Sequence, residues 1–131
     1  MSKINWIDKL GWTQEHIEDL RYTGYAYIRQ GKYDIALSFF EALAVLDPNS
    51  VYDAQTLGAI YIQINEPAKA MIYLDKALKL ETDHAPTLIN LAKALFMLGK
   101  KDEALKLSHL LKNEKNPLIS NVAKALILAY S

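Results

Sequence analysis

Residues 21–50 read RYTGYAYIRQGKYDIALSFFEALAVLDPNS, and this stretch decides the fold because its pattern recurs along the chain. The recurring residues stand 34 positions apart: Gly24 and Gly58; Gly31, Asn65 and Gly99; Ala36, Ala70 and Ala104. Internal periodicity of this length indicates an array of stacked structural repeats. The 131 residues hold three such units and are expected to form one domain.

Each unit has the pattern of two helices joined by a turn. In the first unit, apolar side chains recur at three- and four-residue steps on both sides of the sequence GKY, as on the buried face of a helix. Pro67 and Pro117 suit the first turn of a helix, where the missing N–H costs nothing. The spacing predicts helices over residues 14–30, 33–46, 51–64, 67–80, 85–98 and 101–113, and a seventh helix from 117 onward.

Two glycines of the first unit have different predicted roles. Gly31 follows a helix end, where a left-handed backbone is favoured, and Asn65 at the matching position is the next-best residue for it. Gly24 lies inside a helix, where glycine costs about 1 kcal/mol relative to alanine. Its recurrence as Gly58 and then Ala92 predicts a close contact between helices, where a larger side chain would clash.

These positions resemble the signature of the tetratricopeptide repeat, in which an apolar residue, Leu-Gly, Tyr, Ala, Phe and Pro recur in a 34-residue frame. The first copy has Leu20, Thr23-Gly24, Tyr27, Ala36, Phe40 and Pro48; the second has Ala54, Leu57-Gly58, Tyr61, Ala70 and Leu74; the third has Leu88, Leu91-Ala92, Leu95, Ala104 and Ser108. The resemblance implies an all-α fold, a right-handed α-solenoid of three repeats. We expect an N-terminal segment (1–16), repeats at 17–50, 51–84 and 85–118, and a capping helix (117–131).

Composition narrows the function. Fifteen basic and fifteen acidic residues cancel, and no cluster of Lys and Arg offers the footprint that nucleic acid requires. The chain has no cysteine, which excludes disulfides and thiolate metal sites and suits a reducing cytoplasm. No stretch approaches the ~20 apolar residues that span a bilayer, and the first residues lack the apolar run of a secretory signal. We therefore expect a cytoplasmic protein with no nucleic-acid partner and no membrane insertion.

No motif indicates catalysis. His16, His84 and His109 are the only histidines, and they fall on different elements of the repeat frame. Zinc requires three or four converging ligands, and neither the HExxH spacing, nor a phosphate-binding glycine loop, nor a nucleophile elbow occurs. Neighbouring carboxylates such as Asp102 and Glu103 suit the solvated first turn of a helix. The prediction is a non-enzymatic protein with no catalytic residue, metal or cofactor.

A concave surface is expected from the repeat frame, because in tetratricopeptide arrays the first helix of each unit lines it. The residues that the packing signature leaves free to face it are Arg21, Tyr25 and Ile28, then Tyr52, Gln55, Ala59 and Ile62, then Ile89, Lys93 and Phe96. Apolar and aromatic side chains with a few polar ones between them suit an extended or helical peptide. The alternative is that Ile28, Ile62 and Phe96 only complete the core between helices.

The carboxylate clamp, which holds chaperone C-termini in some tetratricopeptide domains, is not expected here. That clamp uses Lys and Asn, then Asn, then Lys and Arg. The matching residues are Arg21 and Tyr25, then Thr56, then Pro86 and Asn90. Only Arg21 keeps a suitable charge, so we do not expect a heat-shock co-chaperone.

A closer resemblance is carried by Phe40, Ala42-Leu43, Val45-Leu46-Asp47 and Leu57-Gly58-Ala59. These residues resemble the class II chaperones of bacterial type III secretion, which escort translocator proteins; needle-subunit chaperones share the short three-repeat form. The resemblance implies a chaperone that holds one hydrophobic translocator or needle subunit in its groove before export. Arg21, Gln55 and Lys93 would fix the cargo backbone. The N-terminal region, which can dimerise in that group, is shorter here.

The two ends of the chain offer an alternative interface. Apolar residues gather in the N-terminal segment at Ile4, Trp6, Ile7, Leu10 and Trp12. They predict either a short helix that packs on the first repeat, or a contact with a second copy, a small co-chaperone or another partner. The apolar ending ALILAY either caps the array or docks on a partner. Under this alternative the chain is an adaptor that assembles a larger complex through its end helices.

Overall fold

The computed structural model describes residues 5–131 as helices joined by turns. The helices are α1 (Trp6–Leu10), α2 (Gln14–Arg29), α3 (Tyr33–Leu46), α4 (Val51–Gln63), α5 (Pro67–Leu80), α6 (Ala85–Met97), α7 (Lys101–Leu111) and α8 (Pro117–Tyr130). No strand occurs in this part of the chain, and the all-α prediction is confirmed. Among the helices described, none has the length and apolar composition that crossing a bilayer demands.

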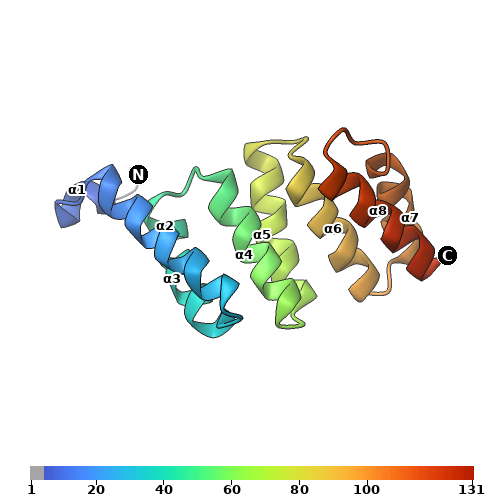
Figure 1. Ribbon diagram of the computed structural model, residues 1–131. Helices are drawn as coiled ribbons and strands as arrows, with labels where there is room; N and C mark the ends of the chain where they lie inside the picture. The colour runs from blue at the N-terminus through green and yellow to red at the C-terminus, as the bar shows by residue number, and fades with distance from the viewer. Residues whose placement is uncertain (1–4) are drawn as a thin grey trace.

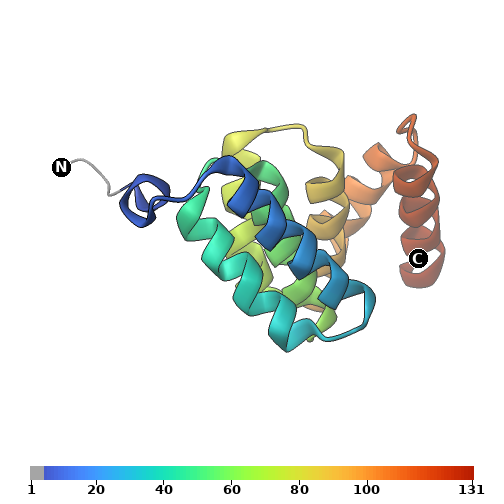
Figure 2. The ribbon, with the colours of Figure 1, turned by 60° about the vertical axis from the view of Figure 1, so that its left-hand side comes forward.

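The helices form a row of pairs that runs from one end of the molecule to the other (Figure 1). The pairs are α2 with α3, α4 with α5, and α6 with α7, and each pair packs on the next. α8 follows the last pair and packs on α6 and α7. Figure 2 shows α1 and α8 at opposite ends of the array. This is the right-handed solenoid of three helix–turn–helix repeats that the resemblance to the tetratricopeptide repeat implied.

The positions that recur along the sequence form the core of the repeats. Fully buried members are Ala36, Ala70 and Ala104. Gly24 and Gly58 lie against the second helix of their own repeat. A Cβ at Gly24 would stand 2.8 Å from Phe40 Cε2, and one at Gly58 would stand 2.7 Å from Leu74 Cγ. Both distances are too short for a side chain, so the helices approach this closely because the two positions have none.

The turn inside each repeat has a residue in the left-handed conformation, as predicted. The angle φ is +73° at Gly31, +61° at Asn65 and +79° at Gly99. One residue beyond each, a backbone N–H bonds to the carbonyl five residues back. These bonds run from Lys32 to Tyr27, from Glu66 to Tyr61 and from Lys100 to Leu95, at 2.8–2.9 Å. They are the closing bonds of the Schellman motif, which satisfies carbonyls left free at a helix end.

The helix bounds differ from the predicted ones at their C-terminal ends. α2, α4 and α6 end at residues 29, 63 and 97, each one residue early, and α7 ends at residue 111 instead of 113. In the first repeat the N–H of Gly31 turns to the carbonyl of Ile28, only three residues back. The same tightening occurs at Asn65 and Gly99. The last predicted residue of these helices therefore belongs to the turn.

The N-terminal segment forms a short helix against the first repeat. Ile7 and Trp12 pack against the core of the first two repeats, and α1 contacts α3. Trp6 and Leu10 are exposed, at 39% and 50%. The packing interpretation therefore holds for Ile7 and Trp12, whereas Trp6 and Leu10 offer apolar surface. Ile4 lies outside the described residues.

Candidate functional site

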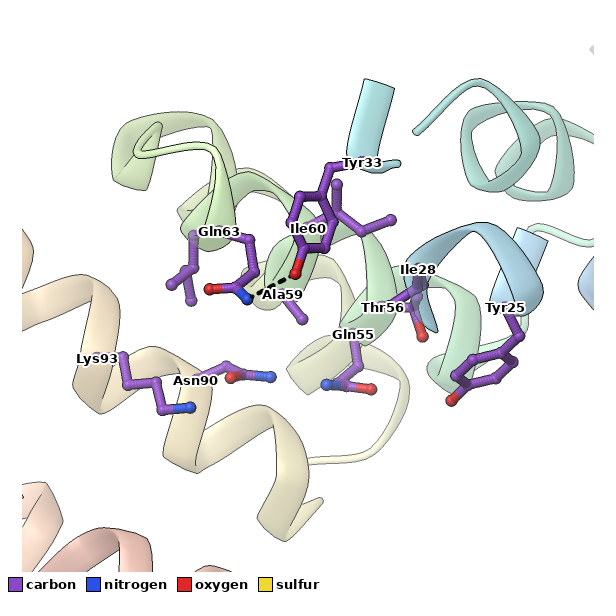
Figure 3. Close-up of a pocket in the computed structure, with 11 residues that line it drawn as sticks. Tyr25, Ile28, Tyr33, Gln55, Thr56, Ala59, Ile60, Gln63, Asn90 and Lys93 are labelled. Carbon is purple, nitrogen blue, oxygen red and sulfur yellow. Dashed lines mark hydrogen bonds between the residues drawn. The ribbon is translucent and has the colours of Figure 1, made fainter. Parts of the chain in front are cut away.

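A cavity of about 320 Å³, which we call the groove, opens on the face formed by the first helices of the repeats (Figure 3). Its lining residues are Tyr25 and Ile28 of α2, Tyr33 of α3, Gln55, Thr56, Ala59, Ile60, Ile62 and Gln63 of α4, and Asn90 and Lys93 of α6. Six of the predicted groove residues are brought together there: Tyr25, Ile28, Gln55, Ala59, Ile62 and Lys93.

The repeat frame arranges these side chains in rows. Tyr25, Ala59 and Lys93 hold one position of the frame in successive repeats, and Ile28 and Ile62 hold another. Ala59 contributes only a methyl group between two long side chains, so the row is hollow at its middle. The two isoleucines supply branched apolar walls. The shape of the groove thus follows from a small residue in the central repeat.

Neutral polar groups line the same space. Gln63 Nε2 donates to the Tyr33 hydroxyl at 3.0 Å and so links α4 to the start of α3 (Figure 3). The amides of Gln55 and Asn90 and the ammonium of Lys93 lie across the groove from this pair. Amides and ammonium groups of this kind can hydrogen-bond the backbone of a peptide.

Tyr33, Thr56, Ile60 and Asn90 also line the groove and were not predicted to do so. Tyr33 begins a second helix, and the prediction took groove residues only from the exposed positions of first helices. The turn at Gly31 brings the start of α3 back towards the end of α4, where the Tyr33 hydroxyl meets Gln63. The signal available in the sequence was an aromatic residue directly after the turn.

Arg21 is held within the chain by three carboxylates. Nε and Nη2 donate to the two carboxylate oxygens of Asp53, each at 2.7 Å, Nη2 also donates to Asp47 at 3.0 Å, and Nη1 pairs with Glu18. Asp53 is 1% exposed. Its hydrogen bond with Arg21 raises the pKa of the guanidinium above its ordinary value. The expectation that Arg21 fixes the cargo backbone is therefore corrected: its donors join α2 to the start of α4.

Tyr25 and Tyr52 stand together beside the groove, with ring centroids 5.3 Å apart. Tyr25 also meets Phe40 edge-on at 6.0 Å, which fixes its ring against the core. Burial raises the pKa of the Tyr25 hydroxyl above its ordinary value. The Tyr52 hydroxyl oxygen is buried and has no hydrogen-bond partner in the described part of the chain. A buried polar group without a partner carries a desolvation cost.

Ile89 and Phe96 do not line the groove, which corrects the expectation for the third repeat. Ile89 packs with Ile119 and Ala123 of α8, and Phe96 stacks on Tyr130 with ring centroids 4.1 Å apart. Ile89 is only 6% exposed and Phe96 8%. Because α8 covers both side chains, the core alternative applies to them, and the groove ends at Asn90 and Lys93.

The groove therefore combines apolar walls, neutral hydrogen-bonding groups and one ammonium. Within residues 5–131, no three His, Cys, Asp or Glu side chains lie close enough together to hold a metal ion. A surface of this composition can bury apolar side chains of a peptide and hydrogen-bond its backbone.

Comparison with known protein sequences gives a family match. The family described as "Anaphase-promoting complex, cyclosome, subunit 3" matches residues 29–112. Anaphase-promoting complex subunit 3 of Schizosaccharomyces pombe is 30% identical over 82 residues, which make up 63% of this chain and 12% of that protein. The chain spans about a tenth of the length of the curated relatives that it matches.

Known structures match over nearly the whole chain. The translocator chaperone SycD of type III secretion in Yersinia enterocolitica superposes with a TM-score of 0.82 at 19% identity, covering 98% of this chain and 99% of SycD. PcrH of Pseudomonas aeruginosa, in complex with the chaperone-binding region of PopD, superposes with a TM-score of 0.80 at 21% identity, covering 92% and 94%. At these identities the likeness shows a common fold.

Proposed function

The chain belongs to the tetratricopeptide-type family described as "Anaphase-promoting complex, cyclosome, subunit 3", and from this premise we propose that it is a non-enzymatic chaperone that holds an apolar segment of a partner protein in its groove. The observation that carries the proposal is the groove itself. Its apolar walls and neutral amides, built on three repeats, fit an extended or helical peptide.

The proposed cargo is a hydrophobic subunit exported by type III secretion, either a translocator or a needle subunit. Support comes from the fold shared with two translocator chaperones over more than 90% of this chain, and from the residues at 40–47 and 57–59 that resemble that group. In this role the chain would act in the cytoplasm, where it keeps the cargo from aggregating until export.

Cargo binding would rest on burial of apolar side chains against Tyr25, Ile28 and Ile62. Each buried aliphatic or aromatic anchor contributes about 1.5–3 kcal/mol before the costs of ordering the peptide. Gln55 and Lys93 would hydrogen-bond the cargo backbone and set its register. Ala59 leaves the space into which an anchor side chain fits.

The test is affinity capture from the native cell with the wild type and two matched variants, Ile62→Glu and Ile72→Glu. Ile62 lines the groove, whereas Ile72 lies on α5, is 66% exposed and lies outside it. Of the two variants, we expect only Ile62→Glu to lose the small secreted subunit that the wild type captures. With the purified cargo, its affinity should fall more than about tenfold, because one lost anchor exceeds 1.4 kcal/mol.

Retention of the secreted subunit by a folded Ile62→Glu variant would reject the groove as the cargo site. The melting temperature of each variant shows whether the array is intact. Phe96 is unsuited to this test, because its ring is part of the packing between α6 and α8.

A second candidate function is an adaptor that binds through the ends of the array. Large apolar side chains are exposed there, with Leu118 at 76% and Leu128 at 83% on α8, and Trp6 and Leu10 on α1. The terminal surfaces of repeat arrays are usually polar, which favours this reading. If the chain is such an adaptor, Leu128→Glu should lose the stable components of the complex, or Trp6→Glu should lose a second copy of the chain. Ile62→Glu should then bind its partners as the wild type does.

A further inference from the structure

A second hollow, of about 530 Å³, adjoins the groove at its first-repeat end. It is lined by Glu18, Asp19, Arg21, Tyr22 and Tyr25 of α2 and by Tyr52 of α4. We call it the tyrosine–acid pocket. Tyr25 lines both this pocket and the groove. A peptide seated in the groove would therefore reach the pocket with its neighbouring residues.

The tyrosine–acid pocket has an excess of negative charge. Arg21 is the only cation among its lining residues, and Glu18, Asp47 and Asp53 already surround the guanidinium. Asp19 adds a carboxylate that forms no ion pair in the described part of the chain. Arg29, the other arginine of α2, lies one helical turn beyond Tyr25 and acts on its hydroxyl, but the carboxylates of Glu18, Asp19, Asp47 and Asp53 still outnumber the two guanidinium groups. The net field at the pocket therefore favours a positive charge.

Aromatic rings form the remaining walls. Tyr25 and Tyr52 stand 5.3 Å apart with their planes tilted by 43°, and Tyr22 is 72% exposed. Tyrosine faces attract ammonium and guanidinium groups through the ring quadrupole.

The opposite end of the groove carries the opposite charge. Lys93 lines the groove at the third repeat, and it forms no ion pair within the described residues. A basic side chain of the cargo is therefore repelled at that end and attracted at the first-repeat end. The opposite charges at the two ends would therefore select cargo segments in which the basic residue lies on one particular side of the apolar anchors.

We propose that the cargo segment carries a lysine or arginine beside its apolar anchors, and that this side chain enters the tyrosine–acid pocket between the tyrosine rings and the carboxylates of Glu18 and Asp19. The proposal rests on the proposed function of the groove and adds the chemical class of segment that it selects: apolar with one flanking basic residue.

The experiment is selection from a phage-displayed library of 12-residue peptides whose central positions alternate among Leu, Ile, Val and Ala and whose flanks are fully varied. The wild type is compared with Glu18→Gln/Asp19→Asn and with a charge-matched control, Glu103→Gln/Glu114→Gln, whose residues are exposed on and after α7. We expect Lys and Arg to be enriched at one flank with the wild type and the control. In the pocket variant this enrichment should fall by up to about fivefold, the most expected from loss of a part-exposed ion pair, because the tyrosine rings are retained.

The possible outcomes separate the two proposals. Apolar peptides selected with no preference for a basic flank, or with the same preference in the pocket variant, overturn the inference and leave the groove function standing. A failure to enrich any apolar peptide rejects the groove function, and the inference with it. Loss of the basic preference at high salt would further support it, because exposed charges are then screened.

Discussion

Asp53 is the residue whose environment most constrains the first half of the array. It is buried at the start of α4, and its two oxygens accept hydrogen bonds from Arg21 of α2 in a fork-to-fork pair. Such a bidentate pair holds both orientation and distance. It therefore fixes the first repeat against the second at the edge of the groove, beside Tyr25 and Tyr52.

Removal of the arginine should be costly. Arg21→Ala leaves the Asp53 carboxylate buried with no cation, and the free energy of unfolding should fall by about 3 kcal/mol. Lys69→Ala is the control, because it breaks an exposed pair with Glu66 that contributes little to stability. Urea titration measures both. Similar small losses in the two variants would show that water reaches Asp53 and that the pair is not structural.

The hydroxyl of Tyr61 gives a residue-scale pH dependence. Burial is the larger cause, and the hydrogen bond to Glu41 Oε1 at 2.8 Å the second; together they raise the pKa of this hydroxyl from 10.0 to about 12. The folded state therefore keeps this proton after the unfolded chain has lost it. The stabilisation is complete below pH 10 and is lost as the pH rises towards 12. The stability difference between wild type and Tyr61→Phe should shrink over that range in urea titrations; a constant difference would contradict the assignment.

Close packing within each helix pair is the main determinant at the scale of elements. Gly24 lets α2 approach Phe40 of α3, and Gly58 lets α4 approach Leu74 of α5. The alternation of small and large residues at these positions sets the distance between paired helices and, through it, the spacing of the first helices that line the groove.

Gly58→Ala should destabilise the protein although alanine favours a helix. The gain in helix propensity is about 1 kcal/mol, whereas overpacking a core costs about 1–3 kcal/mol, and the Leu74 side chain that the new methyl group would meet is fully buried. We expect a net loss of about 1 kcal/mol by urea titration. In the background of Leu74→Ala the same glycine replacement should become favourable. A replacement that costs the same in both backgrounds would show that the two sites are not coupled.

At the scale of the whole molecule, the array has more than one core. One cluster, with Ile17, Phe40, Leu57 and Leu74, spans the first two repeats and extends to Ala94 of α6. A separate cluster joins α6 and α7 to α8 through Ile89 and its neighbours. In solenoids each unit is stabilised mainly by the units it touches. α8 therefore stabilises the third repeat and also marks where the groove ends.

Deletion of residues 117–131 should loosen the third repeat selectively. It uncovers Ile89 and Phe96, whose packing partners Ile119, Ala123 and Tyr130 lie on α8. Amide hydrogen exchange should accelerate most in α6 and α7 and stay close to wild type in α2 and α3, because α4 and α5 separate the first repeat from the third and units are coupled mainly to their neighbours. Uniform acceleration along the chain would instead indicate a single cooperative unit.

The sequence alone determined the repeat length, the number of helices in the array and the left-handed turns. These features depend on local chemistry, such as the period of apolar residues and the freedom of glycine and asparagine at a helix end. Six side chains that the frame assigned to the concave face line the cavity, because a fixed frame repeats the same direction every 34 residues. Whether these six residues bind cargo stays a prediction.

Only the tertiary structure decided which candidate side chains are free. Arg21 is engaged by Asp53, an acid 32 positions along the chain; Ile89 and Phe96 lie under α8; and Tyr33 reaches the groove from a second helix. The repeat frame predicts the direction of a side chain, but it does not predict which other residues contact that side chain. Those contacts depend on the packing of irregular elements, such as the last helix and the loop that carries Asp47, for which the frame has no counterpart.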